Sequence, residues 1–266
     1  MKNPLLPILL ISAFSPLATH AALIATEDFE YGSTSIEGQT GGTGWNYERN
    51  DEAGAPPQLP STWDIAFGGH EIVSGQLVTN NGGVRREFGG NAALNEREGA
   101  FRAEGAMFFS TTMTVASMLP AGQNQWAGVS SYDFLDERIF FGMPGQSGAT
   151  RFFGIAAPGF GGDTFSTIPV VSGVTYTIVG MLDFDNDLLG LWVNPDGSDT
   201  ASSFDVSAAY TGGNWSTALR LASGTPVAWD NLKVGTSFAD VTVPEPSASL
   251  LALGTAGLFF LVRRRG

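Results

Sequence analysis

The sequence predicts an all-β fold, a two-sheet antiparallel β-sandwich, between two short apolar ends. Three observations lead to this class. The 266-residue chain carries 35 glycines and 14 prolines and is only 15% charged, a composition typical of short strands joined by tight turns. Between Ala22 and Val243 the apolar side chains recur with a period near two rather than 3.6. No window of helical length has a clear amphipathic stripe.

The segment AMFFSTTMTVAS shows the strand pattern most clearly. It places Met107, Phe109, Met113 and Val115 on one face, and Phe108, Ser110, Thr112 and Thr114 on the other. The segment LLGLWVN is apolar on both faces, as expected of a central strand. Similar runs bounded by Gly, Pro, Asn or Asp predict about twelve strands in all; they include QWAGVSSYDF, ERIFFGMPG, TRFFGIAAPG, TYTIVGMLDF and VAWDNLKVGTSF.

Charge and cysteine content exclude several classes of function. Setting aside Lys2, the three terminal arginines and Glu245 leaves nine of the 13 basic residues and 25 of the 26 acidic ones, a net charge of −16. A body this acidic repels phosphate backbones, so nucleic acid is not an expected partner. The chain has no cysteine, which excludes disulfides, thiolate metal sites and a cysteine nucleophile.

The N-terminus, MKNPLLPILLISAFSPLATHAALIA, has the three parts of a secretory signal peptide. Lys2 supplies the positive region, residues 5–17 supply the apolar region, and Thr19-His20-Ala21 supplies a small-x-small cleavage site. We expect residues 1–21 to be removed between Ala21 and Ala22 by signal peptidase after passage through the Sec translocon. The body is then expected over residues 22–243.

The C-terminus, VPEPSASLLALGTAGLFFLVRRRG, predicts a membrane anchor over residues 244–266. Residues 247–262 are uncharged and would span about 24 Å as a helix, slightly short of a hydrocarbon core of about 30 Å. The basic cap that follows can reach the interface and sets the cytoplasmic side, so the body is expected outside the inner membrane. The cap consists of Arg263, Arg264 and Arg265.

The order of VPEP, apolar run and arginine cluster resembles the PEP-CTERM sorting signal of Gram-negative bacteria. The resemblance implies that an exosortase, a membrane protease-transferase, reads Pro244, Glu245 and Pro246. It also implies a species that makes exopolysaccharide and biofilm, with the body reaching the cell surface or extracellular matrix. The alternative is an ordinary permanent tail anchor.

The order of segments in the body resembles the concanavalin A-like lectin and glucanase jelly rolls. The segments that carry the resemblance are EDFEYGSTSIEGQTGGTGW, ERIFFGMPG, VGMLDFDNDLLGLWVNPDG and WDNLKVGTSFADV. They are patterns of apolar residues and turns, so the resemblance implies a fold and does not fix a function.

No catalytic constellation stands out in the body. The E-x-D-x-x-E strand motif of laminarinase-type hydrolases of this fold is absent from the sequence, although such enzymes need two carboxylates on one face of a cleft. Glu96 and Glu98 could share a strand face, and solvated surface charges would look the same. His70, the one histidine after signal removal, is expected in a loop. We therefore expect no enzyme; the alternative is a polysaccharide-active hydrolase or lyase with an unrecognised carboxylate pair.

Two segments could hold calcium, which prefers oxygen ligands. In DFDNDLLGLWVNPDG three aspartates alternate, but Leu188 and Asn194 stand where an EF-hand loop needs glycine and glutamate, so a hairpin turn is the favoured interpretation. In many jelly-roll modules an acid from the first strand and one from the last meet a structural ion, which would implicate Glu30 and Asp230. Ordinary edge-strand charges are the alternative, and no other cofactor is expected.

The six tryptophans suggest a sugar-binding surface, because sugar rings stack on aromatic faces. Trp192 and Trp229 lie within apolar strands and are expected in the core. Trp45 and Trp215 lie beside glycine-rich loops and are the candidates for stacking against carbohydrate. Together these patterns predict an exported, non-catalytic protein with a structural or carbohydrate-binding role. A purely adhesive or ice-contacting β surface would need a longer threonine array than STTMT.

Overall fold

The computed structural model describes residues 23–47, 59–60, 62–87, 105–133, 136–158, 162–212, 216 and 218–242, and the statements below concern these residues. They form fifteen strands and one short helix. The first eight strands are β1 (Leu23–Glu27), β2 (Asn46–Tyr47), β3 (Leu59–Pro60), β4 (Asp64–Val73), β5 (Gln76–Glu87), β6 (Ala106–Val115), β7 (Gln125–Asp133) and β8 (Asp136–Gln146). The remaining elements are β9 (Phe152–Ala157), β10 (Gly162–Pro169), β11 (Thr175–Asp183), β12 (Leu188–Val193), β13 (Val206–Ala209), β14 (Ala218–Ser223), β15 (Val227–Gly235) and α1 (Phe238–Thr242).

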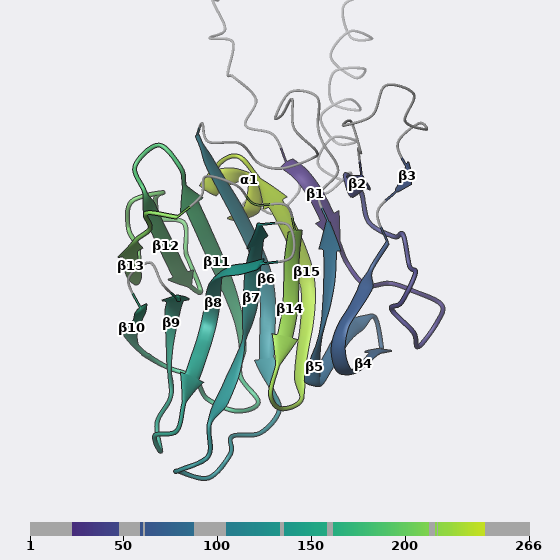
Figure 1. Cartoon of the computed structure of the whole chain (residues 1–266), viewed down its shortest axis with the longest axis horizontal. Coiled ribbons are helices and arrows are strands. Elements are labelled where there is room, and N and C mark those ends of the chain that lie inside the picture. The colour runs from purple at the N-terminus through teal and green to yellow at the C-terminus, as the bar shows by residue number, and fades with distance from the viewer. Residues whose placement is uncertain are drawn as a thin grey trace, which may run out of the picture.

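Thirteen strands form one antiparallel sheet that folds into two layers (Figure 1). The first layer has the order β10-β9-β8-β7-β14 and continues into residues 82–87 of β5. The second layer has the order β13-β12-β11-β6-β15 and continues into residues 77–79 of β5, while β1 pairs with the last part of β15. At the far side β10 and β13 contact each other, so the layers enclose a common interior.

The hairpin β4–β5 joins the layers, because β5 leaves β15 and joins β14 within a few residues. Asn81 lies at this corner with a φ of 46°. On the paired strand Gly68 has a φ of 64°, and a Cβ atom there would lie 1.9 Å from the carbonyl oxygen of Asn81. Only glycine fits both the backbone conformation and the space. The predicted two sheets are therefore two layers of one continuous hydrogen-bonded sheet.

The interior between the layers is filled by the alternating apolar residues that the sequence places on one strand face. Phe109 of β6 meets Phe141 of β8 with ring centroids 5.2 Å apart, and Phe153 of β9 meets Tyr176 of β11 at 4.9 Å. The face predicted for residues 107–115 is confirmed, since Met107, Phe109, Met113 and Val115 all lie in this core. Large apolar burial of this kind is the main stabilising contribution in a protein without disulfides.

The outer face of the second layer carries a separate, smaller apolar cluster. Phe108 and Trp192 lie there beside Val179 and Met181, and α1 covers them with Phe238 and Val241. The burial predicted for Trp192 and Trp229 is confirmed, since they are 1% and 0% exposed. The helix α1 was not predicted, because five residues are too few to produce a helical period.

Two further predictions concern the aspartate-rich turn and the position of His70. The segment around Asp183, Asp185 and Asp187 forms the β11–β12 turn, as expected, and the Asp183 carboxylate accepts hydrogen bonds from the amides of Asp185 and Asn186 at 3.1 Å. The loop position predicted for His70 is wrong. His70 lies within β4 opposite Thr79 of β5, because the glycines before it form a bulge in a strand rather than a loop.

Candidate functional site

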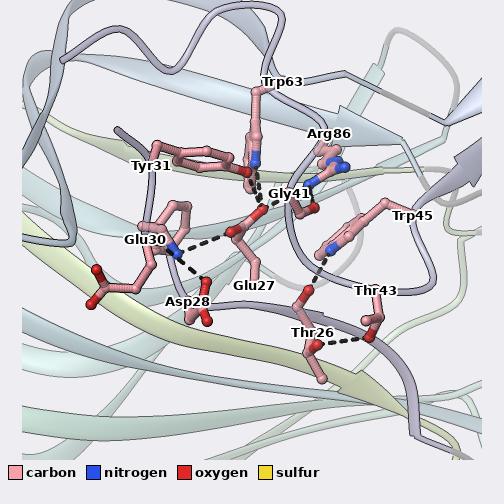
Figure 2. Close-up of polar contacts among 11 residues, drawn as sticks. Thr26, Glu27, Asp28, Glu30, Tyr31, Gly41, Thr43, Trp45, Trp63 and Arg86 are labelled. Carbon is pink, nitrogen blue, oxygen red and sulfur yellow. Dashed lines mark hydrogen bonds and ion pairs between the residues drawn. The ribbon is translucent and has the colours of Figure 1, made fainter. Parts of the chain in front are cut away.

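A buried ionic network lies beneath the loop that follows β1 (Figure 2). The Glu27 carboxylate accepts hydrogen bonds from Arg86 Nη1 at 2.7 Å, Tyr31 Oη at 2.5 Å and Trp63 Nε1 at 3.0 Å. Its second oxygen accepts one from the amide of Phe29 at 2.9 Å. Both charged side chains are almost fully removed from solvent, at 0% for Glu27 and 1% for Arg86. The buried carboxylate is thus satisfied by four donors.

Arg86 connects this carboxylate to the glycine-rich loop. Its Nη1 also donates to the carbonyl oxygen of Gly41 at 2.8 Å, and its guanidinium lies 5.0 Å from the ring centroid of Trp45 and 5.6 Å from that of Trp63. Trp45 Nε1 donates to the carbonyl oxygen of Thr26 at 2.9 Å. Cation–π contacts of this kind stabilise a desolvated guanidinium. The network therefore fixes the loop against the body.

Burial dominates the electrostatics of the network. Burial, together with the hydrogen bond to Glu27, raises the pKa of Tyr31 well above its ordinary value. Burial also lowers the pKa of Arg86, and the neighbouring Glu27 opposes this change. Tyr31 is therefore neutral at physiological pH and acts as a donor. Glu27 thus has no solvent contact and is held by four donors, an arrangement that stabilises the loop against the body.

A cavity of about 660 Å³ lies beside the network, between β1 and the bulged part of β15. Thr26, Asp28, Thr43 and Lys233 contribute to its lining. The hydroxyls of Thr26 and Thr43 hydrogen-bond to each other at 2.8 Å, as Figure 2 shows. The lining offers hydroxyl groups, two acidic residues (Glu27 and Asp28) and one basic residue (Lys233), which suits small polar molecules without specifying one.

The outer face of the first layer has a row of small residues that crosses five strands. The strand registers place Gly83, Ala222, Gly128, Gly142 and Gly154 side by side from β5 to β9. Aromatic rings occupy the space that side chains would take at three of these positions. They are the rings of Phe67 over Gly83, Phe140 over Gly128 and Phe165 over Gly154.

These rings form part of a larger aromatic surface, which we define as Phe67, Trp126, Phe140 and Phe165. The Trp126 ring lies 6.1 Å from that of Phe67 and 6.2 Å from that of Phe140. Phe67 is 36% exposed and Phe165 43% exposed, while Trp126 is partly exposed and Phe140 is mostly covered. Phe67 and Phe165 therefore rest on glycine backbone and remain partly exposed, as aromatic rings that stack against a ligand must be.

Paired charges border the aromatic surface. Arg220 donates to Glu137 at 2.6 Å and to the hydroxyl of Ser130 at 3.0 Å. The same guanidinium lies 5.5 Å from the ring centroid of Phe67 and 5.2 Å from that of Tyr132. Its Nε is buried and has no hydrogen-bond partner among the residues that the structure describes. A rigid arginine–carboxylate pair beside partly exposed rings offers donors and acceptors at fixed positions.

Of the two tryptophans proposed for stacking, Trp45 does not belong to this surface. Trp45 is 2% exposed and lies in the main core, where its indole donates a hydrogen bond to Thr26 and contacts the guanidinium of Arg86. Its burial leaves no ring face for a sugar, so the structure argues against that role. Trp215 lies outside the described residues. Sequence reasoning missed the aromatic surface because it arises from strand register; the alternation of Trp126, Gly128, Ser130 and Tyr132 in QWAGVSSYDF was the one local signal.

The structure brings Glu30 and Asp230 near each other, as the calcium prediction requires. Burial raises the pKa of Asp230, and the charges of Glu30 and Asp28 raise it further, while a hydrogen bond from the amide of Asn231 at 2.7 Å opposes the change. Within the described ranges, no group of three or more His, Cys, Asp or Glu side chains is placed to hold a metal ion. The calcium role stays a prediction.

The remaining predicted sites lie outside the described residues. They are the cleavage site at Ala21 and Ala22, the motif Pro244, Glu245 and Pro246, the basic cap Arg263, Arg264 and Arg265, and the pair Glu96 and Glu98. In the part of the chain that the structure describes, no helix has the length and apolar character to cross a membrane.

Comparisons with known proteins identify one segment of the chain. Residues 242–265 match the PEP-CTERM protein-sorting motif. The chain therefore carries a sorting signal of this class directly after α1, as its sequence predicts. This signal supports an exported protein that an exosortase sorts at the membrane. No curated protein sequence matches the chain.

Solved structures resemble the body only distantly. The receptor-binding domain of botulinum neurotoxin C/D mosaic serotype is 6% identical, with a TM-score of 0.49 over 87% of this chain and 51% of that one. The binding domain of serotype G is 8% identical, with a TM-score of 0.46 over 81% and 48%. This chain thus spans about half the length of these two domains. An endo-β-1,4-glucuronan lyase from the fungus Trichoderma reesei is 14% identical, with a TM-score of 0.39 over 79% and 98%.

Proposed function

We propose that the chain is a non-catalytic, exported protein whose body binds carbohydrate at the cell surface or in the extracellular matrix. The sorting motif at residues 242–265 supports export and sorting. Sec-dependent export, removal of residues 1–21 by signal peptidase, a membrane helix over residues 247–262 and a place in biofilm exopolysaccharide are the finer parts of this proposal. The proposal includes no cofactor; a structural calcium ion at Glu30 and Asp230 stays a separate prediction.

The observation that carries the binding proposal is the aromatic surface on the first layer. Phe67, Trp126 and Phe165 present partly exposed rings along a row of glycines, and the Arg220–Glu137 pair lies beside Phe67. Sugar rings bind through stacking of their C–H faces and through hydrogen bonds from hydroxyl groups to planar polar side chains. The surface supplies both kinds of contact.

The charges on this surface favour a neutral glycan over a strongly anionic one. Arg220 is paired with Glu137, and Arg85 lies 3.6 Å from Glu87. An anionic polymer would have to approach these carboxylates in a body that is already acidic. Hydroxyl groups of a neutral sugar can bridge an arginine and its carboxylate without breaking the pair.

A glycan array tests the proposal with the purified body, residues 22–243, and two variants. We expect the wild-type body to bind neutral oligosaccharides, and Trp126→Ala or Phe67→Ala to weaken binding at least tenfold, or about 1.4 kcal/mol. Val171→Ala is the matched control, since Val171 is 48% exposed and lies outside the aromatic surface. Binding that survives both aromatic substitutions would contradict the site.

The same samples test the alternative of a polysaccharide-active enzyme. The proposal predicts binding without new reducing ends or unsaturated products when the body is incubated with polysaccharide. Sugar release that increases linearly with protein concentration would replace the binding role with a catalytic one.

A further inference from the structure

The helix α1 is held on the second layer by side chains at both of its ends. Ser237 and Asp240 cap it reciprocally: the amide of Ser237 donates to Asp240 Oδ2 at 2.9 Å, and the amide of Asp240 donates to Ser237 Oγ at 3.3 Å. At the other end Ser110 Oγ donates to the carbonyl oxygen of Val241 at 2.8 Å. This second bond ties the last turn of α1 to strand β6, which lies 131 residues earlier in the chain.

Apolar contacts complete the docking. Phe238 is 8% exposed and Val241 4% exposed, and the Phe238 ring lies 4.8 Å from that of Trp192. Gly235 of β15 allows the close approach, since a Cβ atom there would lie 2.6 Å from Cβ of Asp240. The helix is therefore a packed part of the body rather than a loose linker.

The sorting motif begins where this docked helix ends. The matched segment starts at residue 242, the last residue of α1, and Pro244 follows two residues later. An enzyme that acts at a motif in a peptide chain must surround residues on both sides of it, and extended segments are the form in which enzymes and receptors pair with peptide backbones. Residues 238–242 are helical, and the carbonyl oxygen of Val241 is already occupied by Ser110.

We propose that α1 is a latch that restrains access of the sorting protease to the motif, and that α1 must leave the second layer before the tail is processed. A five-residue helix has little stability of its own, so its docking rests on the side-chain contacts described above. A short packed segment at one end of a domain can open locally while the rest of the fold persists. The latch would couple the rate of sorting to this local opening. This inference rests on the proposed sorting function.

Pulse-chase labelling of the full chain tests the latch in cells that contain a PEP-CTERM exosortase, with loss of the C-terminal tail measured by mass. Phe238→Ala removes the main docking contact and should accelerate tail removal at least fivefold. A ten-residue Gly-Ser insertion between Thr242 and Val243 leaves α1 docked but moves the motif away from the body, and it should accelerate removal to a similar extent.

Val129→Ala is the matched control. Val129 is fully buried in the first layer, away from α1, so this variant weakens the body without releasing the helix and should be processed at the wild-type rate. Equal rates for the wild type, Phe238→Ala and the insertion would overturn the latch and leave the sorting proposal intact. Acceleration by Val129→Ala equal to that by Phe238→Ala would also overturn it, since general unfolding would explain both. If no variant loses its tail, both proposals fail.

Discussion

Glu27 and Arg86 form an ion pair of 2.7 Å in the interior, although 59 residues separate them in the sequence. Glu27 ends β1 and Arg86 lies near the end of β5, so the pair connects the first strand of the body to the hairpin that joins the two layers. The hydroxyl of Tyr31 and the indole of Trp63 complete the shell around the carboxylate. The buried charge pair is thus one of the contacts that hold the N-terminal loop against the body.

Glu27→Gln tests how strongly this pair holds the fold. Removing one partner leaves the Arg86 charge buried without compensation, which typically costs about 3–5 kcal/mol of the free energy of unfolding. Urea denaturation of the body measures this loss. The exposed pair Arg138–Asp136, at 3.3 Å, provides the control, because Asp136→Asn should cost less than about 1 kcal/mol. Equal effects of the two substitutions would show that the buried pair is not structural.

Gly44→Ala tests the fit of the loop against β1. Gly44 has a φ of 79°, and a Cβ atom there would lie 1.7 Å from the carbonyl oxygen of Ile24. The strained backbone and the clash together should destabilise the body by about 1–3 kcal/mol or more. Gly32→Ala serves as the control because nothing lies within 4 Å of its Cβ position. The thermal midpoints of the two variants should therefore differ clearly, and identical midpoints would contradict the loop geometry.

Asp230→Asn tests the electrostatics of the acidic pair formed by Asp230 of β15 and Glu30. The pKa of Asp230 in the folded protein lies above the ordinary value of 3.8, so the folded state binds the proton more tightly than the unfolded state. Stability contributed by this group is present at low pH and lost as pH rises through the folded pKa. In calcium-free buffer Asp230→Asn should therefore be slightly more stable than the wild type at pH 7, and the difference should vanish near pH 3. A less stable variant at pH 7 would contradict this account.

If Glu30 and Asp230 bind calcium, the ion should make the wild type more stable than Asp230→Asn at pH 7. Calcium at one hundred times its dissociation constant would stabilise the wild-type body by about 2.7 kcal/mol. We expect a rise in the thermal midpoint of the wild type in calcium chloride, and none for Asp230→Asn or Glu30→Gln. Magnesium chloride at the same ionic strength is the control. An unchanged wild-type midpoint would leave the two acids as ordinary edge charges.

The strands and the core could be predicted from sequence because each depends on local alternation. The two faces of residues 106–115 show this, with Phe109 in the main core and Phe108 in the smaller cluster. The continuous sheet could not be predicted, since it depends on a corner at Gly68 and Asn81 where β5 changes partners. The burial of Trp45 was missed because the pairing of Glu27 with Arg86 joins distant residues.

The aromatic surface could not be predicted from the sequence for a related reason. Gly128 and Trp126 lie in one predicted strand, but Phe67, Arg220 and Gly83 come from three others, and only the strand registers place them together. The sorting signal could be predicted because its motif, apolar run and basic cap are consecutive in the sequence. A motif made of consecutive residues could therefore be predicted from this sequence, whereas a surface made of residues from several strands could not.

In this account the body is exported, and the sorting motif in the tail then directs its release from the inner membrane. Protease accessibility on intact cells of an exosortase-containing host, followed by fractionation, tests this with the full chain and the double variant Pro244→Ala/Pro246→Ala. We expect the wild-type body outside the inner membrane and released from it, and the double variant exported but retained in the membrane fraction. A body protected inside the cytoplasm, or the same distribution for both proteins, would contradict the account.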